Sequence, residues 1–245
     1  MGQNVTAQIL HHALIVAHGQ PSDPAPAEAD LAVLAAAVAS HLPGWSVTSA
    51  TLADPAALIR AVHGAAEGFV YPMFMADGWF TTTHLPERLA AAGAANWRIL
   101  APFGLDPDVQ ALTVKIAREA TMNQSISAEV LLAAHGSFRS TAPSDVAYAM
   151  VRHLMAAGTT HVEAGFIDQS PQIAEVARNF GPNAICLPFF AAKGGHVIDD
   201  LPQALAEAGF LGRLLPPVGL DPRVPGLIAN ALSTALRHAP SAATG

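Results

Sequence analysis

Short apolar runs rich in β-branched residues alternate with alanine- and leucine-rich stretches of helical length along the whole chain. The runs are almost uniformly apolar, as expected of strands that are covered on both faces of a sheet. Their alternation with helical stretches indicates βα units built around a parallel sheet. We predict strands at residues 13–17, 47–52, 68–75, 98–103, 129–134, 161–167, 184–190 and 213–218.

The chain repeats itself, with small length changes in the loops. The clearest pair is RILAPFGLDPDV at 98–109 and RLLPPVGLDPRV at 213–224, which are offset by 115 residues. ALIVAHGQ at 13–20 recurs as VLLAAHGS at 130–137, and YPMFMADGWFTTTHLP at 71–86 answers LPFFAAKGGHVIDDLP at 187–202. Two half-chains therefore share one plan.

We predict an α/β fold in which two doubly wound parallel-sheet halves follow each other, residues 1–122 and 123–245. The polar stretch 121–127 is the natural link between them. The last helix of each half should open at an Asp-Pro pair, Asp106-Pro107 or Asp221-Pro222, because Asp caps free N–H groups and Pro suits the first helical position. A single (βα)₈ barrel, usually ~250 residues long, stays open as the alternative.

Composition and charge narrow the function classes. Hydrophobic residues make up 51% of the 245 residues and charged residues 13%, which is typical of a folded globular protein. The net charge is −7 and the 12 Lys and Arg are scattered, so we expect no nucleic-acid partner. No apolar run approaches the ~20 residues that span a bilayer, and the start lacks the basic segment of a signal peptide. We expect a cytoplasmic protein without a membrane partner.

The single cysteine, Cys186, lies in the apolar run AICLPFF. It has no partner for a disulfide within the chain. We interpret it as a buried core thiol.

Candidate chemistry gathers where predicted strands end. His18 and His135 each close a strand and open a glycine-containing loop, and His196 follows the strand ICLPFF. Ligands bind at the carboxyl edge of open parallel sheets, so these are functional positions. Glu163 is a carboxylate in an otherwise apolar strand, and burying it unpaired would be costly. In the first half the position of His196 is held by Phe80, and Glu163 maps onto Val47, so we expect one complete site, in the second half.

The segments AAHGSFRS at 133–140, VEAGFID at 162–168 and LPFFAAKGGHVIDDLP at 187–202 resemble the sirohydrochlorin chelatases of CbiX/SirB type. These are class II tetrapyrrole chelatases related in fold to ferrochelatase, and longer members carry two fused halves. The resemblance implies insertion of a divalent metal (cobalt, iron or nickel) into sirohydrochlorin or a related tetrapyrrole, for cobalamin or siroheme. It implies no organic cofactor, with the metal as a substrate, and a cleft between the two halves.

Carried over residue by residue, the resemblance makes His135 and His196 the metal-handling histidines and Glu163 their acidic partner. The usual Arg after His-Gly-Ser is Phe138 here, and Arg139 follows one place later. We expect Ser137, Arg139 and Lys193 to contact the substrate, whose carboxylates need local cations. With both halves in one chain, we expect a monomer.

Other function classes fit less well. There is no G-x-S-x-G elbow of an α/β-hydrolase, no P-loop and no G-x-G-x-x-G sequence. The residues before His18-Gly19 and His135-Gly136 are alanines, whereas a histidine phosphatase would resemble Arg-His-Gly. The remaining alternative is a tetrapyrrole or metal carrier that keeps the fold without turnover.

Overall fold

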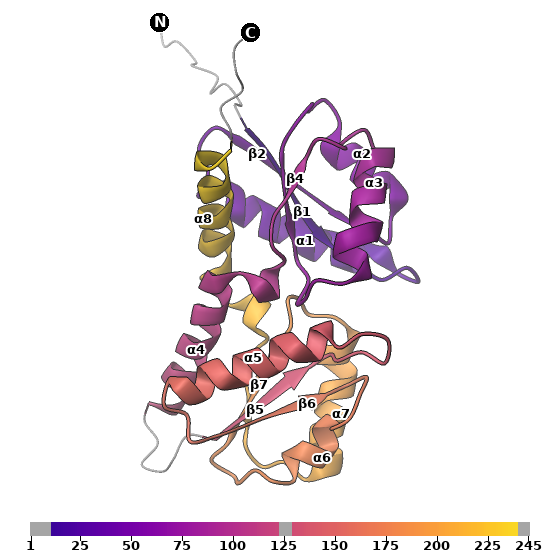
Figure 1. Ribbon diagram of the computed structural model, residues 1–245. Coiled ribbons are helices and arrows are strands. Elements are labelled where there is room, and N and C mark those ends of the chain that lie inside the picture. The colour runs from indigo at the N-terminus through magenta and orange to yellow at the C-terminus, as the bar shows by residue number, and fades with distance from the viewer. Residues whose placement is uncertain (1–10, 123–128, 240–245) are drawn as a thin grey trace, which may run out of the picture. The chain divides into compact units, whose positions relative to one another are not determined.

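The computed structural model describes residues 11–122 and 129–239 (Figure 1). It contains two separate four-stranded sheets, in the orders β2-β1-β3-β4 and β6-β5-β7-β8, and every pairing is parallel. The prediction of two parallel-sheet halves is confirmed, and the alternative of a single closed barrel is wrong. The predicted boundary, within 121–127, falls mostly outside the described residues.

The first sheet and its helices include the following elements: β1 (His11–Ala17), α1 (Pro24–Ala39), β2 (Trp45–Thr51), α2 (Pro55–Val62), β3 (Phe69–Pro72), η1 (Phe80–His84), α3 (Leu85–Ala91), β4 (Arg98–Ile99) and α8 (Val224–Arg237). The second includes η2 (Phe103–Leu105), α4 (Pro107–Thr121), β5 (Glu129–Ala134), α5 (Ala142–Ala156), β6 (His161–Phe166), α6 (Ile173–Ala177), β7 (Ile185–Pro188), η3 (His196–Asp200), α7 (Leu201–Ala208), β8 (Arg213–Leu214) and η4 (Val218–Leu220). Here η1 and η3 are π-helical turns, and η2 and η4 are 3₁₀ turns.

The last helix of each sequence half packs in the unit built on the other half's sheet. Among the described residues, one compact unit comprises 11–73, 79–101 and 223–239, and the other comprises 74–78, 102–122 and 129–222. Figure 1 shows α8, in yellow, beside the strands of the first unit. Equivalent arginines tie the exchanged helices down: Arg98 donates to the carbonyl of Ala235 in α8, and Arg213 donates to that of Ala120 in α4.

The repeated GLDP sequence has a packing cause. A side chain on Gly104 would lie 2.1 Å from the carbonyl oxygen of Met75, and one on Gly219 would lie 1.9 Å from that of Ala191. Only glycine fits so close to a backbone.

The two Asp-Pro pairs differ in whether the Asp caps the following helix. Asp106 caps α4 by accepting a hydrogen bond from the N–H of Asp108. The expectation for Asp221 is wrong, because α8 begins at Val224 and its N-cap, Arg223, makes no side-chain cap bond.

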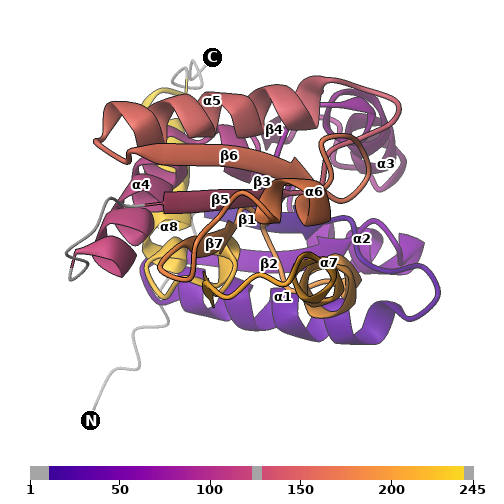
Figure 2. The same ribbon diagram turned by 90° about the horizontal axis from the view of Figure 1, so that it is seen from below.

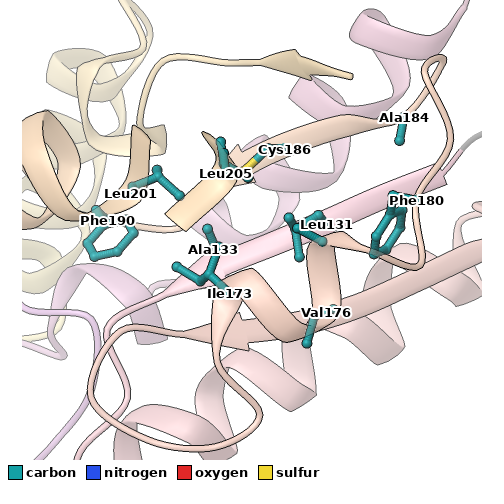
Figure 3. Packing of buried hydrophobic residues seen from close by; sticks show 11 residues of the cluster. Leu131, Ala133, Ile173, Val176, Phe180, Ala184, Cys186, Phe190, Leu201 and Leu205 are labelled. Carbon is teal, nitrogen blue, oxygen red and sulfur yellow. The ribbon is translucent and has the colours of Figure 1, made fainter. Parts of the chain in front are cut away.

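In the second unit, β6, β5 and β7 run side by side in that order (Figure 2). Successive residues of a strand face opposite sides, so Leu131 and Ala133 point to α6 and α7, while the alternate residues of β5 point to the α4 and α5 side. Figure 3 shows the core on the α6 and α7 side, where Cys186 lies fully buried. The interpretation of Cys186 as a core thiol is confirmed, and burial raises the pKa of this thiol strongly.

No helix in the described parts of the chain is long and apolar enough to cross a membrane.

Candidate functional site

Two histidines meet at the carboxyl edge of the second sheet. His135 directly follows β5, and His196 opens the π-helical turn η3 in the loop after β7, the neighbouring strand. Their ring centroids lie 4.5 Å apart with the planes at 88°, an edge-to-face contact. The sheet thus brings together the two histidines singled out in the sequence, although 61 residues separate them along the chain.

The ring of His135 is oriented through its Nδ1 atom. This nitrogen lies 2.9 Å from the carbonyl oxygen of Gly136 and 3.5 Å from Oδ2 of Asp168. Asp168 follows β6, and its backbone N–H donates to the carbonyl of His135, which fixes the two residues to each other. A carbonyl and a carboxylate both accept, so they favour the tautomer that carries its proton on Nδ1.

His196 is oriented in the same way by Asp200. Its Nδ1 lies 2.6 Å from Oδ2 of Asp200, and the π-helical turn places these two residues, four apart, on one side. Such turns are uncommon and concentrate at functional positions. A carboxylate behind the imidazole fixes the tautomer and the orientation of the ring.

Both rings therefore present Nε2 with its lone pair. Their side chains are 42% and 44% exposed, so an ion from solvent can reach them. Neutral imidazole is a ligand for iron, cobalt and nickel. Within residues 11–122 and 129–239 no group of three or more His, Cys, Asp or Glu is arranged to hold a metal. Two imidazoles with carboxylates behind them suit an ion that is taken up and passed on.

Glu163 does not join this pair. It is level with Leu131 in the β5–β6 register, four residues before His135, which at ~3.3 Å per residue is about 13 Å along the strand. Its carboxylate lies 2.7 Å from Nε2 of His161 and accepts a hydrogen bond from Asn179. The expected convergence of Glu163 with the two histidines is wrong, because Glu163 lies early in β6.

The register also corrects the expected match between the halves. Leu14 and Leu131 hold the same place in β1 and β5, and they pair with Thr48 and Glu163. Thr48, rather than Val47, is therefore the counterpart of Glu163.

The other predicted substrate contacts lie in the two histidine loops. Ser137 holds its own loop: its N–H donates to Gln169 and its hydroxyl accepts from the N–H of Arg139. Arg139 and Lys193 are exposed, and neither makes an ion pair with another described residue. Both cations remain available to an anionic ligand.

Sequence reasoning missed Asp168 and Asp200 as partners of the histidines. Both lie inside the quoted segments VEAGFID and KGGHVIDDLP, and each carried a usable signal. Asp168 comes two residues after the end of β6, at the same sheet edge as His135. Asp200 is four residues from His196, the spacing that puts two side chains on one helical face.

The first half repeats this geometry with different side chains. His18 and Phe80 have ring centroids 4.5 Å apart at 77°. Phe80 and His84 open and close η1 as His196 and Asp200 do in η3. The predicted equivalence of Phe80 and His196 is confirmed, and a phenyl ring stands here where the second half has an imidazole.

The place of Asp168 in the first half is held by Ala53. Leu52 donates to the carbonyl of Ala17 as Ile167 donates to that of Ala134, and Ala53 and Asp168 are the residues that follow. The first half therefore also lacks the carboxylate at this place.

Comparison with known proteins identifies the family. The sequence profile of CbiX matches residues 129–235, the region that holds His135 and His196. The solved structure of CbiX, described as the terminal enzyme for biosynthesis of siroheme in denitrifying bacteria, is 49% identical, with 92% of this chain and 99% of that chain covered and a TM-score of 0.85. This chain belongs to the CbiX family. It is thus a member of a metal chelatase family.

More distant structures share the CbiX fold. SirB from Bacillus subtilis with Fe³⁺ is 16% identical, covering 94% of this chain and 98% of its own, at a TM-score of 0.70. The sirohydrochlorin chelatase SirB from Bacillus subtilis subspecies spizizenii, in complex with cobalt, is 17% identical, covering 93% and 96%, at a TM-score of 0.66. At this identity the likeness concerns the fold alone. No curated protein matches the chain.

Proposed function

We propose that this CbiX-family protein inserts a divalent metal, cobalt or iron and less readily nickel, into sirohydrochlorin or a related tetrapyrrole. The observation that carries the proposal is the pair of edge-to-face imidazoles, each backed by a carboxylate, at the carboxyl edge of one sheet. The 49% identity to a CbiX described as a siroheme enzyme supports iron and siroheme over cobalt and cobalamin.

The reaction needs ligands and bases together, because the ion must lose water while two pyrrole N–H protons leave. We assign the metal to Nε2 of His135 and His196, which replace water molecules one at a time and hand the ion over. Once the ion has moved, the same nitrogens are free to accept the pyrrole protons. The charge of each imidazolium is then stabilised by the carboxylate behind it, Asp168 or Asp200.

In this mechanism Asp168 and Asp200, and not Glu163, are the acidic partners of the two histidines. Glu163 instead holds His161 within the second unit, where that ring also stacks on Phe180 at 4.5 Å. Arg139 and Lys193, both exposed beside the histidine loops, are assigned to the carboxylates of the substrate. Ser137 shapes the first loop through its contacts with Gln169 and Arg139. The presence of both pseudo-symmetric halves in one chain supports a monomer as the active unit.

The test follows the absorbance of metal-free sirohydrochlorin with Fe²⁺, Co²⁺ and Ni²⁺ in turn, without oxygen, and subtracts the rate without protein. We expect the protein to accelerate insertion, most with iron. Binding of the tetrapyrrole without any acceleration would make the protein a carrier and overturn the proposal. A rate that is fastest with cobalt would keep the chelatase and reverse the choice of metal.

A further inference from the structure

The first half keeps the scaffold of the metal-handling pair but not its chemistry. The His18–Phe80 contact reproduces the His135–His196 contact at the same 4.5 Å centroid distance. A phenyl ring has no lone pair for a metal ion. This contact therefore cannot ligate a metal ion through two imidazoles as the His135–His196 contact can.

A set of three rings, which we call the aromatic platform, stands on this scaffold: Trp79, Phe80 and His84. Trp79 occupies the position of Gly195, one residue before the π-helical turn, so a large ring replaces no side chain at all. Its indole stacks on His84 at 4.7 Å and 18°, and contacts Phe80 at 5.1 Å and 70°. The platform is thus built from one short segment and held by its own ring contacts.

The indole is fixed by its neighbours and is nonetheless 59% exposed. Exposing a large apolar ring is unfavourable, and such rings gather at binding surfaces. A ring already held in place loses little conformational entropy when a ligand covers it. The segment 71–86, which carries the platform, contains no Lys or Arg. That suits the uncharged face of a flat ring system rather than the phosphates of a nucleotide.

We propose that the aromatic platform binds one face of the flat conjugated macrocycle by stacking, with Trp79 as its main contact. The proposal rests on the proposed function for the identity of the ligand. It makes Trp79 a binding residue for the tetrapyrrole and gives it no part in metal handling. The indole N–H adds a donor for a substrate carboxylate.

The test measures equilibrium binding of metal-free sirohydrochlorin to the full chain, together with binding of Co²⁺ alone. We expect Trp79→Leu to raise the dissociation constant for the macrocycle about 10-fold, and the conservative Trp79→Phe about 3-fold. The dissociation constant for Co²⁺ should stay within 2-fold of the unsubstituted protein. Ile59→Ala is the matched control, because Ile59 is an exposed apolar residue of the same unit, at 53%, and should change neither constant.

Different results overturn the aromatic platform and the proposed function. Unchanged macrocycle binding in Trp79→Leu, with insertion intact, would overturn the platform and leave the chelatase standing. An unsubstituted protein that neither binds nor inserts would overturn both proposals. If Trp79→Leu also loses Co²⁺ binding, its defect is one of folding, and Trp79→Phe then decides between the outcomes. A raised constant for the macrocycle alone in Trp79→Phe supports the platform, and an unchanged constant overturns it.

Discussion

The two halves have the same strand order and matching π-helical turns, yet in the second half two imidazoles meet where in the first an imidazole meets a phenyl ring. At the loop ends the second half has His196, Asp200 and Asp168, where the first has Phe80, His84 and Ala53. The sheets beneath are equivalent strand by strand. The comparison shows that the scaffold and the chemistry are separable, because a few positions at the sheet edge decide what each half can do.

We expect the largest effect from removing one imidazole from each half in turn. His135→Ala or His196→Ala should lower kcat for metal insertion by about 100-fold or more, because a metal ligand and proton acceptor is lost. His18→Ala should stay within about 2-fold, since its ring neighbour is a phenyl. Initial rates at saturating macrocycle and metal decide this. Equal losses at His18 and His135 would mean that both halves contribute equally to the reaction.

The carboxylates give the next largest effect. Asp200→Asn should lower metal affinity or insertion about 10–100-fold, and Asp168→Asn about 10-fold, because each leaves an imidazole without its charged partner. Glu163→Gln is the matched control. Its carboxylate contacts His161 instead of the metal-handling histidines. The insertion rate should therefore stay within about 2-fold, while the free energy of unfolding falls by about 0.5–1 kcal/mol.

Co²⁺ titration of Asp200→Asn, Asp168→Asn and Glu163→Gln checks the expected order of their effects on metal affinity. A loss at Glu163→Gln as large as that at Asp168→Asn would restore Glu163 to the site and contradict the geometry. A neutral effect of Asp200→Asn would remove the orienting role of that carboxylate.

Three substitutions give the first half the side chains of the second. Changing Phe80→His, His84→Asp and Ala53→Asp together supplies the first half with the groups it lacks. We expect Co²⁺ binding to rise from one ion per chain to two, with the new site about 10-fold weaker because its surroundings were not shaped for it. Isothermal titration measures the ratio. Retention of one ion per chain would show that further positions are required.

The smallest effect lies in the core. Cys186 holds the place of Val70 in the first sheet, and both are fully buried. Burial raises the pKa of the Cys186 thiol, so the folded protein keeps it protonated while the unfolded chain ionises above pH ~8.5. The contribution of the protonated thiol to the free energy of unfolding is complete below that pH. Above it, this contribution falls by about 1.4 kcal/mol per pH unit.

Cys186→Val copies the residue of the first half and should remove this dependence. Urea unfolding of both proteins between pH 7 and 10 gives the difference directly, since all other groups are shared. Between pH 8.5 and 10 we expect the free energy of unfolding of the variant to rise by about 1–2 kcal/mol relative to that of the unsubstituted protein. Parallel curves would show that the thiol ionises without consequence for folding.

Strand positions could be predicted from the sequence because each strand is a short, almost purely apolar run, and the internal repeat fixed their number in each half. The strand ends could not be predicted as well: β4 and β8 shrink to two residues each, although the apolar runs that contain them are longer. The exchange of α4 and α8 has no sequence signal, because a helix that buries an apolar face does not show which sheet it covers.

The site could be predicted in part. His135 and His196 could be found because each lies beside glycine just after a strand, and parallel strands end together. Glu163 was misassigned although its place as the third residue of the predicted strand 161–167 already put it far from the carboxyl end of the strand, where the histidines lie. Asp168 was overlooked because an aspartate in a loop is ordinarily solvated. Its place just after β6 was the usable signal, and its backbone bond to His135 shows that it is held there.

The exchanged helix α8 bears on the order in which the chain folds during synthesis. The first sheet is complete at Ile99, but one of its covering helices runs to Arg237. Until those residues have emerged, the apolar surface that meets α8 stays uncovered, whereas α4 is made before any strand of the second sheet. The first sheet thus keeps apolar surface uncovered for longer during translation than the second sheet does, and uncovered apolar surface favours aggregation.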